Sequence, residues 1–448
     1  MGLLFRRVLA GFCFRRKRVI FSLDLSNLVL GILAMALGCQ AIGTAVSAQN
    51  VDPNSDLGQF RELRAAGMKA LDDKDSGTAL LKFNAAQHLM PDSPSVILLK
   101  VQLFQQNHDM EQARAAMHDY LLRGYTLDLG RNPDFNALWT TELNDLAEAN
   151  VSPLGNLHVL AALPGFTISE AMTYAPQSDQ LYVSGIRTGK LMSISPQGTR
   201  DMLTFRPGVA AYGLGLHNGM IWAATAASRQ TKGFEAKLNI ASKIVAINPA
   251  NGQIDSQFAD KSKDRRFGHL LAGRDDLYVT DTDSGEVLRL NGYAGDLQVL
   301  VPEGYLDSPE GLSENADSTI LMVSDFISGL YRVDLKEGTL THLLPPTDGT
   351  LIGISSLSRY GQDLIGIQTG FKPNRVVRIH LSDDWKEVRS IEVLMRSPKY
   401  LSQPSQGVVA GDRFVFVAKS QWGNMDDQGN PISTDPEPSV IGQLTLVP

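Results

Sequence analysis

Cysteine is nearly absent from this chain. Only Cys13 and Cys39 occur among its 448 residues, and both lie within the first 48. If that segment is removed, the remaining chain has no disulfide framework, no thiolate metal site and no cysteine nucleophile. The sequence also lacks a P-loop, a His-Glu-x-x-His zinc helix, a Gly-x-Ser-x-Gly nucleophile elbow and a dinucleotide-binding fingerprint. These absences exclude several common classes of enzyme.

Basic residues are scarce outside the N-terminal segment. The formal net charge is -7, and removal of residues 1–48, which hold six Lys or Arg and one Asp, would make it -12. Phosphate binding needs a basic face, and no cluster of basic residues follows residue 48. Nucleic acid is therefore not an expected partner.

The N-terminal segment has the layout of a secretory signal. Basic residues at positions 6, 7 and 15–18 precede an apolar run from Leu25 to about Gly38. Small residues follow, and the segment ends in Val46-Ser47-Ala48. This order predicts a signal peptide over residues 1–48, cleaved after Ala48, and a linker over 49–57. The protein is then expected in the periplasm or outside the cell.

Two other interpretations of this segment place the protein at a membrane. The apolar run could remain as an anchor, although it is shorter than the ~20 unbroken apolar residues of a span and contains Ser26 and Asn27. Alternatively, Ala36-Leu37-Gly38-Cys39 resembles a bacterial lipobox, in which a lipid is attached to the cysteine, with Leu37 in place of the usual small residue. In either case only this segment would contact the membrane.

Residues 58–147 are expected to be helical, and one stretch has the spacing of a tetratricopeptide repeat. Gly67 and Ala79 would let two antiparallel helices approach closely, Phe83 would fill the space between them, and Pro91 would end the second helix. A weaker second copy, displaced by 34 residues, lacks the glycine. Since a partner-binding array needs about three repeats, we expect a small helical cap or docking surface.

From about Leu157 the pattern changes to short β-strands that recur. Six runs of similar form begin 40, 56, 44, 43 and 50 residues apart, and a turn and a second run follow most of them. This spacing is typical of four-stranded propeller blades. The runs are Leu181–Ser184, Ile221–Ala224, Leu277–Thr280, Leu321–Ser324, Leu364–Ile367 and Phe414–Val417.

We therefore predict a mainly β fold, in which a six-bladed β-propeller over residues 157–448 follows a small helical region. Six units that cannot bury their own faces can close into a ring, whereas an open β-sandwich would not explain one strand pair recurring six times. The final run, Val440–Leu446, and the opening run, Leu157–Leu160, are expected to complete one blade from both chain ends. Such closure removes exposed sheet edges.

Several stretches of the β region carry a family resemblance. They are Pro309–Leu312 before Leu321–Asp325, Arg359–Gln368, Pro373–Arg378, and Gln406–Val409 leading to Ser420–Trp422. Through them, residues 157–446 resemble the family of senescence marker protein 30 and gluconolactonase. The resemblance implies a six-bladed propeller of a kind that often hydrolyses lactones with one divalent cation, calcium or a similar metal. Because these stretches are strand patterns and not a catalytic signature, they support the fold better than an activity.

Counting back from the six runs places residues of each blade at the mouth of the central channel. Ligands from several blades can converge there, and oxygen-bearing side chains would suit calcium or magnesium. The mouth positions are Glu170, Tyr212, Gly268 with His269, Glu310, Ser355 and Gln406.

The metal pattern that the resemblance implies matches these positions only in part. Glu170 corresponds to the family's first-blade glutamate. Gly268 and Glu310 each stand where the family has an asparagine, and Ser355 stands where it has an aspartate that is both a metal ligand and the usual acid/base candidate. Glutamate can still bind a cation, so Glu170 and Glu310 are the candidate metal ligands. No catalytic residue is assigned.

Three functions are open for such a chain. The first is an exported binding module, whose channel or rim holds a small molecule or a protein and whose helical region docks a partner. The second is a divergent metal-dependent hydrolase of lactones or esters that uses Glu170, Glu310 and His269. The third is a structural scaffold of the cell envelope with an empty channel. The altered metal pattern favours the first of these.

Overall fold

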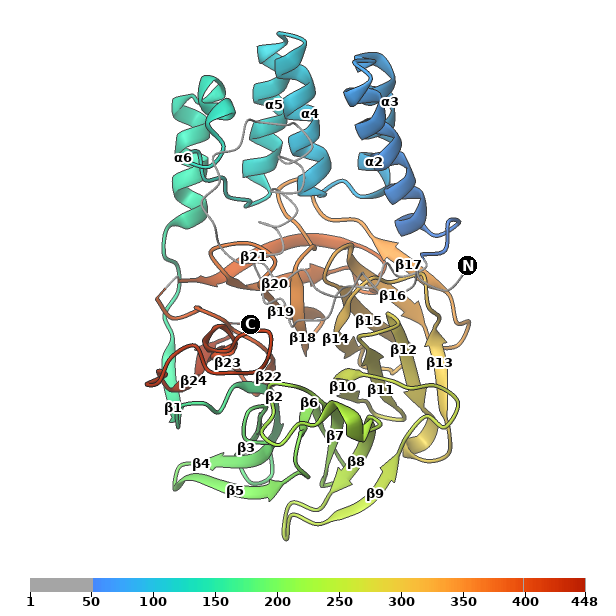
Figure 1. The fold of residues 1–448 in the computed structure, drawn as a ribbon, viewed down its shortest axis with the longest axis vertical. Helices are drawn as coiled ribbons and strands as arrows, with labels where there is room; N and C mark the ends of the chain where they lie inside the picture. The colour runs from blue at the N-terminus through green and yellow to red at the C-terminus, as the bar shows by residue number, and fades with distance from the viewer. Residues whose placement is uncertain (1–50, 398, 448) are drawn as a thin grey trace, which may run out of the picture.

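The computed structural model describes residues 51–397 and 399–447. The predicted signal peptide lies outside these residues, as does the start of the predicted linker. Within the described ranges, no helix is long and apolar enough to cross a membrane. Figure 1 shows the helices standing on one side of a ring of small β-sheets.

The helical region contains five α-helices in the described part of the chain. Polar side chains cap the starts of four of them, because the free N–H groups of a first helical turn need acceptors. Ser55, Asp75, Asp109 and Thr140 each accept a hydrogen bond of 3.0–3.3 Å from the backbone N–H three residues ahead. The helices are α2 (Asp56–Asp72), α3 (Ser76–Leu89), α4 (Pro94–Gln106), α5 (Met110–Leu122) and α6 (Thr141–Val151), with a 3-10 helix, η1 (Pro133–Leu138), before α6.

The first two helices pack through the small residue that the sequence places between them. Phe83 of α3 is fully buried, and a Cβ atom added at Gly67 of α2 would lie 2.5 Å from its ring. Only glycine permits that approach. Helices α4 and α5 form a second hairpin. The predicted helical region is therefore confirmed, whereas its assignment as a tetratricopeptide repeat stays a prediction.

A buried polar contact holds the helical region on the propeller. Asp92, which precedes α4, is 1% exposed, and its carboxylate accepts hydrogen bonds of 2.9 Å from both Thr350 Oγ1 and the Leu351 N–H. The Tyr125 hydroxyl donates to the carbonyl oxygen of Asp92 at 2.6 Å. A buried carboxylate without such donors would be strongly unfavourable, so these bonds fix the position of the helices.

Arginines of the propeller also bind the ends of the last two helices. Arg396 donates to the carbonyl oxygens of Ala149 and Ser152, at 2.6 and 2.7 Å, at the end of α6. Arg375 approaches the carbonyl oxygen of Gly124, just after α5, at 3.5 Å. Positive charge is favourable at the C-terminus of a helix. The helical region and the propeller therefore pack as one body.

The propeller consists of six four-stranded antiparallel sheets, each running from an inner strand beside the channel to an outer strand. The first three are β2 (Ser169–Ala175), β3 (Gln180–Gly185), β4 (Lys190–Ser195) and β5 (Gly198–Thr204); β6 (Val209–His217), β7 (Met220–Ala227), β8 (Lys243–Ile247) and β9 (Ile254–Phe258); and β10 (Phe267–Ala272), β11 (Leu277–Asp281), β12 (Glu286–Leu290) and β13 (Leu297–Val301). The last three are β14 (Pro309–Glu314), β15 (Ile320–Asp325), β16 (Gly329–Asp334) and β17 (Leu340–Leu343); β18 (Ile354–Tyr360), β19 (Asp363–Gln368), β20 (Arg375–Leu381) and β21 (Val388–Arg396); and β22 (Gly407–Ala410), β23 (Arg413–Lys419), β24 (Ser439–Thr445) and β1 (His158–Leu163).

This topology confirms the predicted six-bladed propeller. All six repeated runs lie on the second strand of a blade. The first strand of the propeller, β1, pairs antiparallel with the last, β24, from His158 opposite Gln443 to Leu163 opposite Ser439. One blade is therefore built from both chain ends, which leaves the ring without an open edge at its junction.

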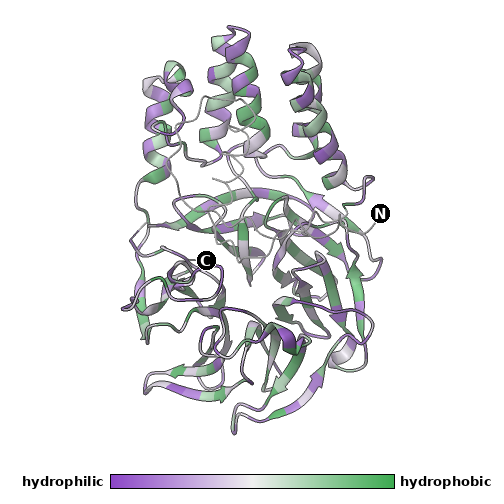
Figure 2. Cartoon of the chain, in the orientation of Figure 1, coloured by the Kyte–Doolittle hydropathy of each residue, from purple (hydrophilic) through white to green (hydrophobic). Residues whose placement is uncertain are grey.

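Apolar side chains from neighbouring blades form the cores between them. Figure 2 shows hydrophobic and hydrophilic residues alternating along the strands, as half-buried sheets require. Trp222 of β7 illustrates the packing between blades: its ring lies 6.0 Å from that of Phe258 and 4.9 Å from that of Tyr293, which belongs to the next blade. The inner strands contact one another around the ring and enclose the central channel.

Candidate functional site

The predicted mouth residues lie together at the start of the inner strands. In five inner strands the register with the second strand shifts at the predicted position. Such bulges re-aim side chains and are common next to functional sites. Glu170, Tyr212, His269, Glu310 and Ser355 lie inside these shifts, and Gln406 immediately precedes β22.

A hydroxyl group on the second strand supports the irregular backbone in three blades. In these blades the repeated run ends in serine or threonine. The hydroxyl oxygen of that residue accepts a hydrogen bond from a backbone N–H that the register shift leaves without a partner on the neighbouring strand. The pairs are Ala171 N with Ser184 Oγ at 3.0 Å, His269 N with Thr280 Oγ1 at 3.0 Å, and Gly311 N with Ser324 Oγ at 2.9 Å. The repeat thus encodes both the strand and the support of the bulge beside it.

Polar side chains from several blades form a connected layer across the channel. The Trp422 indole N–H donates to the Glu170 carboxylate. Gln406 donates through Nε2 to the carbonyl oxygen of Tyr212 at 2.6 Å, and this nitrogen lies 3.4 Å from His269 Nε2. His269 Nε2 in turn lies 3.0 Å from Glu310 Oε2. We call these residues the polar layer.

Glu170 is the most perturbed acid of this layer. Burial raises the pKa of its carboxyl to about 7, and the nearby negative charge of Glu310 acts in the same direction. Hydrogen bonds from Trp422 and Gln406, and the proximity of His269, oppose the rise. Glu170 therefore gains or loses its proton near neutral pH, which an exposed glutamate does not do.

The connection between β23 and β24 lies over Glu170, at the end of the channel where the inner strands begin. It contains the 3-10 helix η4 (Trp422–Asn424), and Trp422 is 7% exposed. Trp422 and Met425 pack with Ile168 and Tyr212 in one buried apolar cluster. As a result, the carboxylate of Glu170 meets protein groups on this side.

The polar layer does not fit a hard cation. Calcium takes six to eight oxygen ligands, whereas the oxygens of Glu170 receive bonds from Trp422 and Gln406, and Glu310 faces His269. Ser355, which stands where the resembled family has an aspartate, donates to the carbonyl oxygen of Ile367 at 3.3 Å. The described residues contain no group of three or more His, Cys, Asp or Glu placed to hold a metal ion. The predicted metal roles of Glu170 and Glu310 therefore gain no support from this arrangement.

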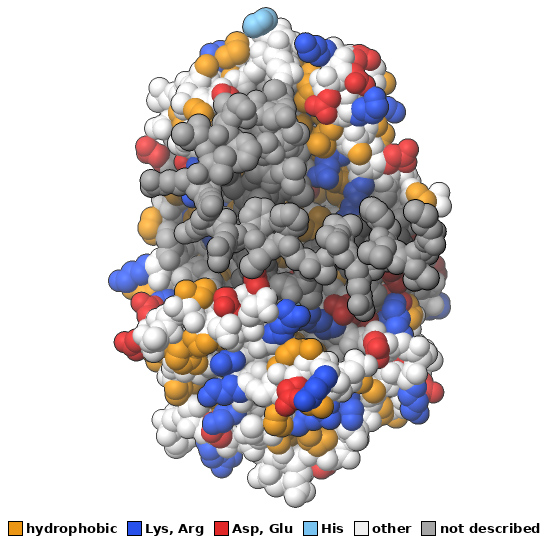
Figure 3. All heavy atoms as spheres, viewed as in Figure 1, with side chains coloured by type: hydrophobic (Ala, Val, Ile, Leu, Met, Phe, Trp, Pro, Cys, Tyr) orange, Lys and Arg blue, Asp and Glu red, His pale blue; other side chains and the backbone are white. Residues whose placement is uncertain are grey.

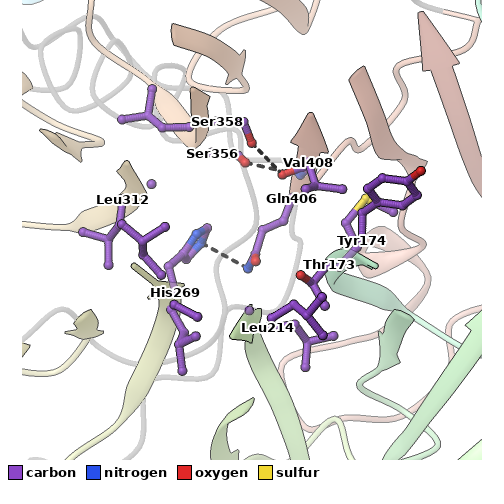
Figure 4. Close-up of a pocket in the computed structure, with 18 of the residues that line it drawn as sticks. Thr173, Tyr174, Leu214, His269, Leu312, Ser356, Ser358, Gln406 and Val408 are labelled. Carbon is purple, nitrogen blue, oxygen red and sulfur yellow. Dashed lines mark hydrogen bonds between the residues drawn. The ribbon is translucent and has the colours of Figure 1, made fainter. Parts of the chain in front are cut away.

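A cavity of about 510 Å³ lies in the channel on the other side of His269 and Gln406. It extends to the turns that join the inner to the second strands, where Gln177 and Asn218 are exposed. In Figure 4, His269 and Gln406 reach toward each other across the channel from different blades. The cavity therefore has a polar inner end and opens at the end of the channel opposite Trp422.

The cavity wall repeats one apolar position around the ring. In five inner strands this apolar residue pairs with the third residue of the repeated run. In the sixth blade, β22 contributes Val408, which pairs with the second residue of the run. The five are Met172, Leu214, Leu270, Leu312 and Leu357. Sequence reasoning missed this ring, although aligning the inner strands on the repeated runs would have found it. It also missed the contact between Trp422 and Glu170, which no local pattern encodes.

By topology, the chain is a six-bladed β-propeller with a helical region packed on it. No family model and no curated protein matches the sequence. Similar solved structures include a gluconolactonase from Xanthomonas campestris, 16% identical with a TM-score of 0.45, over 67% of this chain and 93% of that one. The calcium-binding protein regucalcin from Agrobacterium tumefaciens is 15% identical with a TM-score of 0.47, over 65% and 94%. An aldose sugar dehydrogenase from Streptomyces coelicolor is 14% identical with a TM-score of 0.42, over 65% and 99%. These low-identity likenesses carry no argument about activity.

Proposed function

We propose that the protein is an exported binding module whose central channel holds a small molecule. The observation that carries this proposal is the cavity of about 510 Å³ that joins the buried polar layer to exposed turns. Small-molecule sites are typically preformed cavities of roughly 300–1,000 Å³, lined mainly by apolar side chains with a few polar groups. The channel has the size of such a site, and its lining combines apolar side chains with polar groups.

Binding accounts for the polar layer better than metal-dependent hydrolysis of lactones or esters does. A hydrolase of that kind needs a cation with open coordination positions and a base that reaches a water molecule. Glu170, the acid with the raised pKa, is instead engaged by Trp422 and Gln406. Through the same contacts, Glu170 has a positioning role, since it holds Gln406 at the polar inner end of the cavity.

The proposal includes two elements that rest on other grounds. Export rests on the sequence of residues 1–48, whose basic start, apolar middle and small-residue end are typical of a signal peptide. Docking of a protein partner is assigned to the tetratricopeptide-like hairpins, because they stand away from the channel (Figure 1). Neither element is needed for the channel to bind a ligand.

A matched pair of variants tests the channel. Val408 lines the cavity and packs against the core on one side of its blade, while its neighbour Val409 packs in the core on the other side and does not line the cavity. Both side chains are partly buried. We expect Val408→Phe to reduce the cavity and abolish binding, and Val409→Phe to retain binding, because successive residues of a strand point to opposite sides. A thermal-shift screen of neutral and charged small molecules, including sugar lactones, reports binding to the folded state.

Ligands that stabilise the wild type and Val409→Phe, but not Val408→Phe, would support the proposal. If no compound distinguished the two variants, the channel would not be the binding site. Turnover of a lactone that disappears on metal removal would favour the hydrolase instead.

A further inference from the structure

We propose that the protein binds an acidic protein segment on a strip of basic side chains, at the end of the channel where the inner strands begin. This surface is separate from the cavity proposed to hold a small molecule, which opens at the opposite end. We call it the basic strip. It is formed by Arg187, Arg206, Arg229 and Lys232.

Backbone hydrogen bonds join the three connections that carry the basic strip. Arg187 lies in the turn from β3 to β4, Arg206 between β5 and β6, and Arg229 and Lys232 between β7 and β8. The Lys232 N–H donates to the Arg187 carbonyl oxygen at 3.1 Å, and the Lys232 carbonyl oxygen accepts from the Gly208 N–H at 2.8 Å. The fold therefore gathers basic residues that no continuous stretch of the sequence brings together.

The charges of the basic strip are not neutralised by the protein. In the part of the chain that the structure describes, none of the four side chains forms an ion pair, and the acidic neighbour Glu235 is paired with Lys237 at 3.0 Å. Arg187 is half-buried, and its Nη1 donates to the carbonyl oxygens of Gln230 at 3.1 Å and Gly429 at 3.3 Å. Because a partly desolvated guanidinium gains from an opposite charge, an external carboxylate is a favourable partner for it.

The other three side chains of the basic strip are exposed to solvent. Figure 3 shows Lys and Arg side chains on this face of the molecule, over the blades of β2–β5 and β6–β9. The whole chain carries a formal net charge of -7, so the basic strip has a sign opposite to that of the protein. Such a local patch attracts and orients a negatively charged partner.

Two features of the same face favour a protein segment over other anions. Leu238, in the connection from β7 to β8, is 53% exposed and offers apolar contact area that a free inorganic anion would not use. The connection from β23 to β24 lies beside the strip, since Arg229 donates to Gln428 Oε1 at 3.5 Å, and it exposes Asp427 and Asp435. A planar anionic membrane would meet these carboxylates as well as the strip, whereas a narrow acidic segment can follow the strip alone.

Fluorescence anisotropy with a labelled octaglutamate peptide tests the proposal, at about 0.1 M salt, where charges more than about 10 Å apart are largely screened. Charge reversal at the three exposed positions should weaken binding by about tenfold or more. This strip variant combines Arg206→Glu, Arg229→Glu and Lys232→Glu. Arg187 is left unchanged, because its bonds to two carbonyl oxygens also hold the connections together.

A matched control variant reverses three exposed lysines on other connections and changes the net charge of the chain by the same amount. It combines Lys74→Glu, Lys336→Glu and Lys386→Glu, and it should bind the peptide within about twofold of the wild type. Val408→Phe should also leave peptide binding unchanged, so this test does not depend on the small-molecule site. Circular dichroism checks that each variant has folded.

Three outcomes would overturn the proposal. An equal loss of binding in the strip and control variants would mean that net charge alone attracts the peptide. Absence of peptide binding to the wild type would exclude an acidic segment as the partner. Capture of the wild type, but not of the strip variant, by phosphatidylglycerol vesicles without binding of the peptide would assign the strip to a membrane surface instead.

Discussion

The raised pKa of Glu170 makes a quantitative prediction about stability and pH. Its carboxyl has a pKa of about 7 in the folded protein, against an ordinary value of 4.5. Between these values the native state holds a proton that the unfolded chain has released, so the free energy of unfolding falls as the pH rises from about 5 to about 8. A difference of about 2.5 pKa units corresponds to about 3 kcal/mol.

Glu170→Gln isolates this contribution. Glutamine keeps the size of the side chain and an oxygen that can accept the Trp422 indole N–H, but it cannot ionise. The measured quantity is the free energy of unfolding of the variant minus that of the wild type. This difference should be about 3 kcal/mol higher near pH 8 than near pH 5. Urea unfolding at a series of pH values, followed by tryptophan fluorescence, measures both proteins, and Glu337→Gln serves as an exposed control that should follow the wild type.

A difference between Glu170→Gln and the wild type that stays constant from about pH 5 to about pH 8 would refute the reasoning. It would mean that Glu170 is ionised throughout, as an exposed carboxylate would be. Other acids with raised pKa values, such as Glu314, shape both curves alike and cancel in the difference.

Four further predictions follow from single contacts. Trp422→Phe removes the donor to Glu170, so it should destabilise the protein by about 1–3 kcal/mol in urea unfolding and raise the pKa of Glu170 further. Gly67→Ala forces a Cβ atom against Phe83, and we expect a loss of about 1–3 kcal/mol, seen as earlier melting of helical circular dichroism. Arg396→Ala removes two hydrogen bonds to the end of α6 and should cost about 1–3 kcal/mol in the same assay. Calcium or a chelator should leave the melting temperature unchanged, and stabilisation that saturates with calcium would contradict the assigned lack of fit to a hard cation.

The repeated runs carried enough information to predict the propeller. Each run, such as Leu277–Thr280, combines an apolar second strand with, in three blades, a hydroxyl that supports the neighbouring bulge. The apolar second strand recurs in every blade, so it leaves a period in the sequence. Closure by β1 and β24 was also predictable, because a ring of repeats has one junction and both chain ends carry an unmatched strand.

The site was less accessible to sequence reasoning, because its decisive contacts join residues far apart in the chain. Glu170 stands where the family resemblance implies a metal ligand, and nothing near it indicates that an indole 252 residues later donates to its carboxylate. Trp422 itself belongs to a connection between strands, where length and composition vary without a period. Residue identity predicted where Glu170 lies, but only the fold shows what it contacts.

The two ends of the channel now receive different interpretations for one physical reason. At the end near Trp422, buried carboxylates and their donors satisfy one another, which leaves little coordinating capacity for a ligand. At the other end, the residues of the apolar ring pack in the cores between blades, and the cavity reaches exposed turns. The binding site that we propose therefore lies at the opposite end of the channel from the metal chemistry that the family resemblance implies.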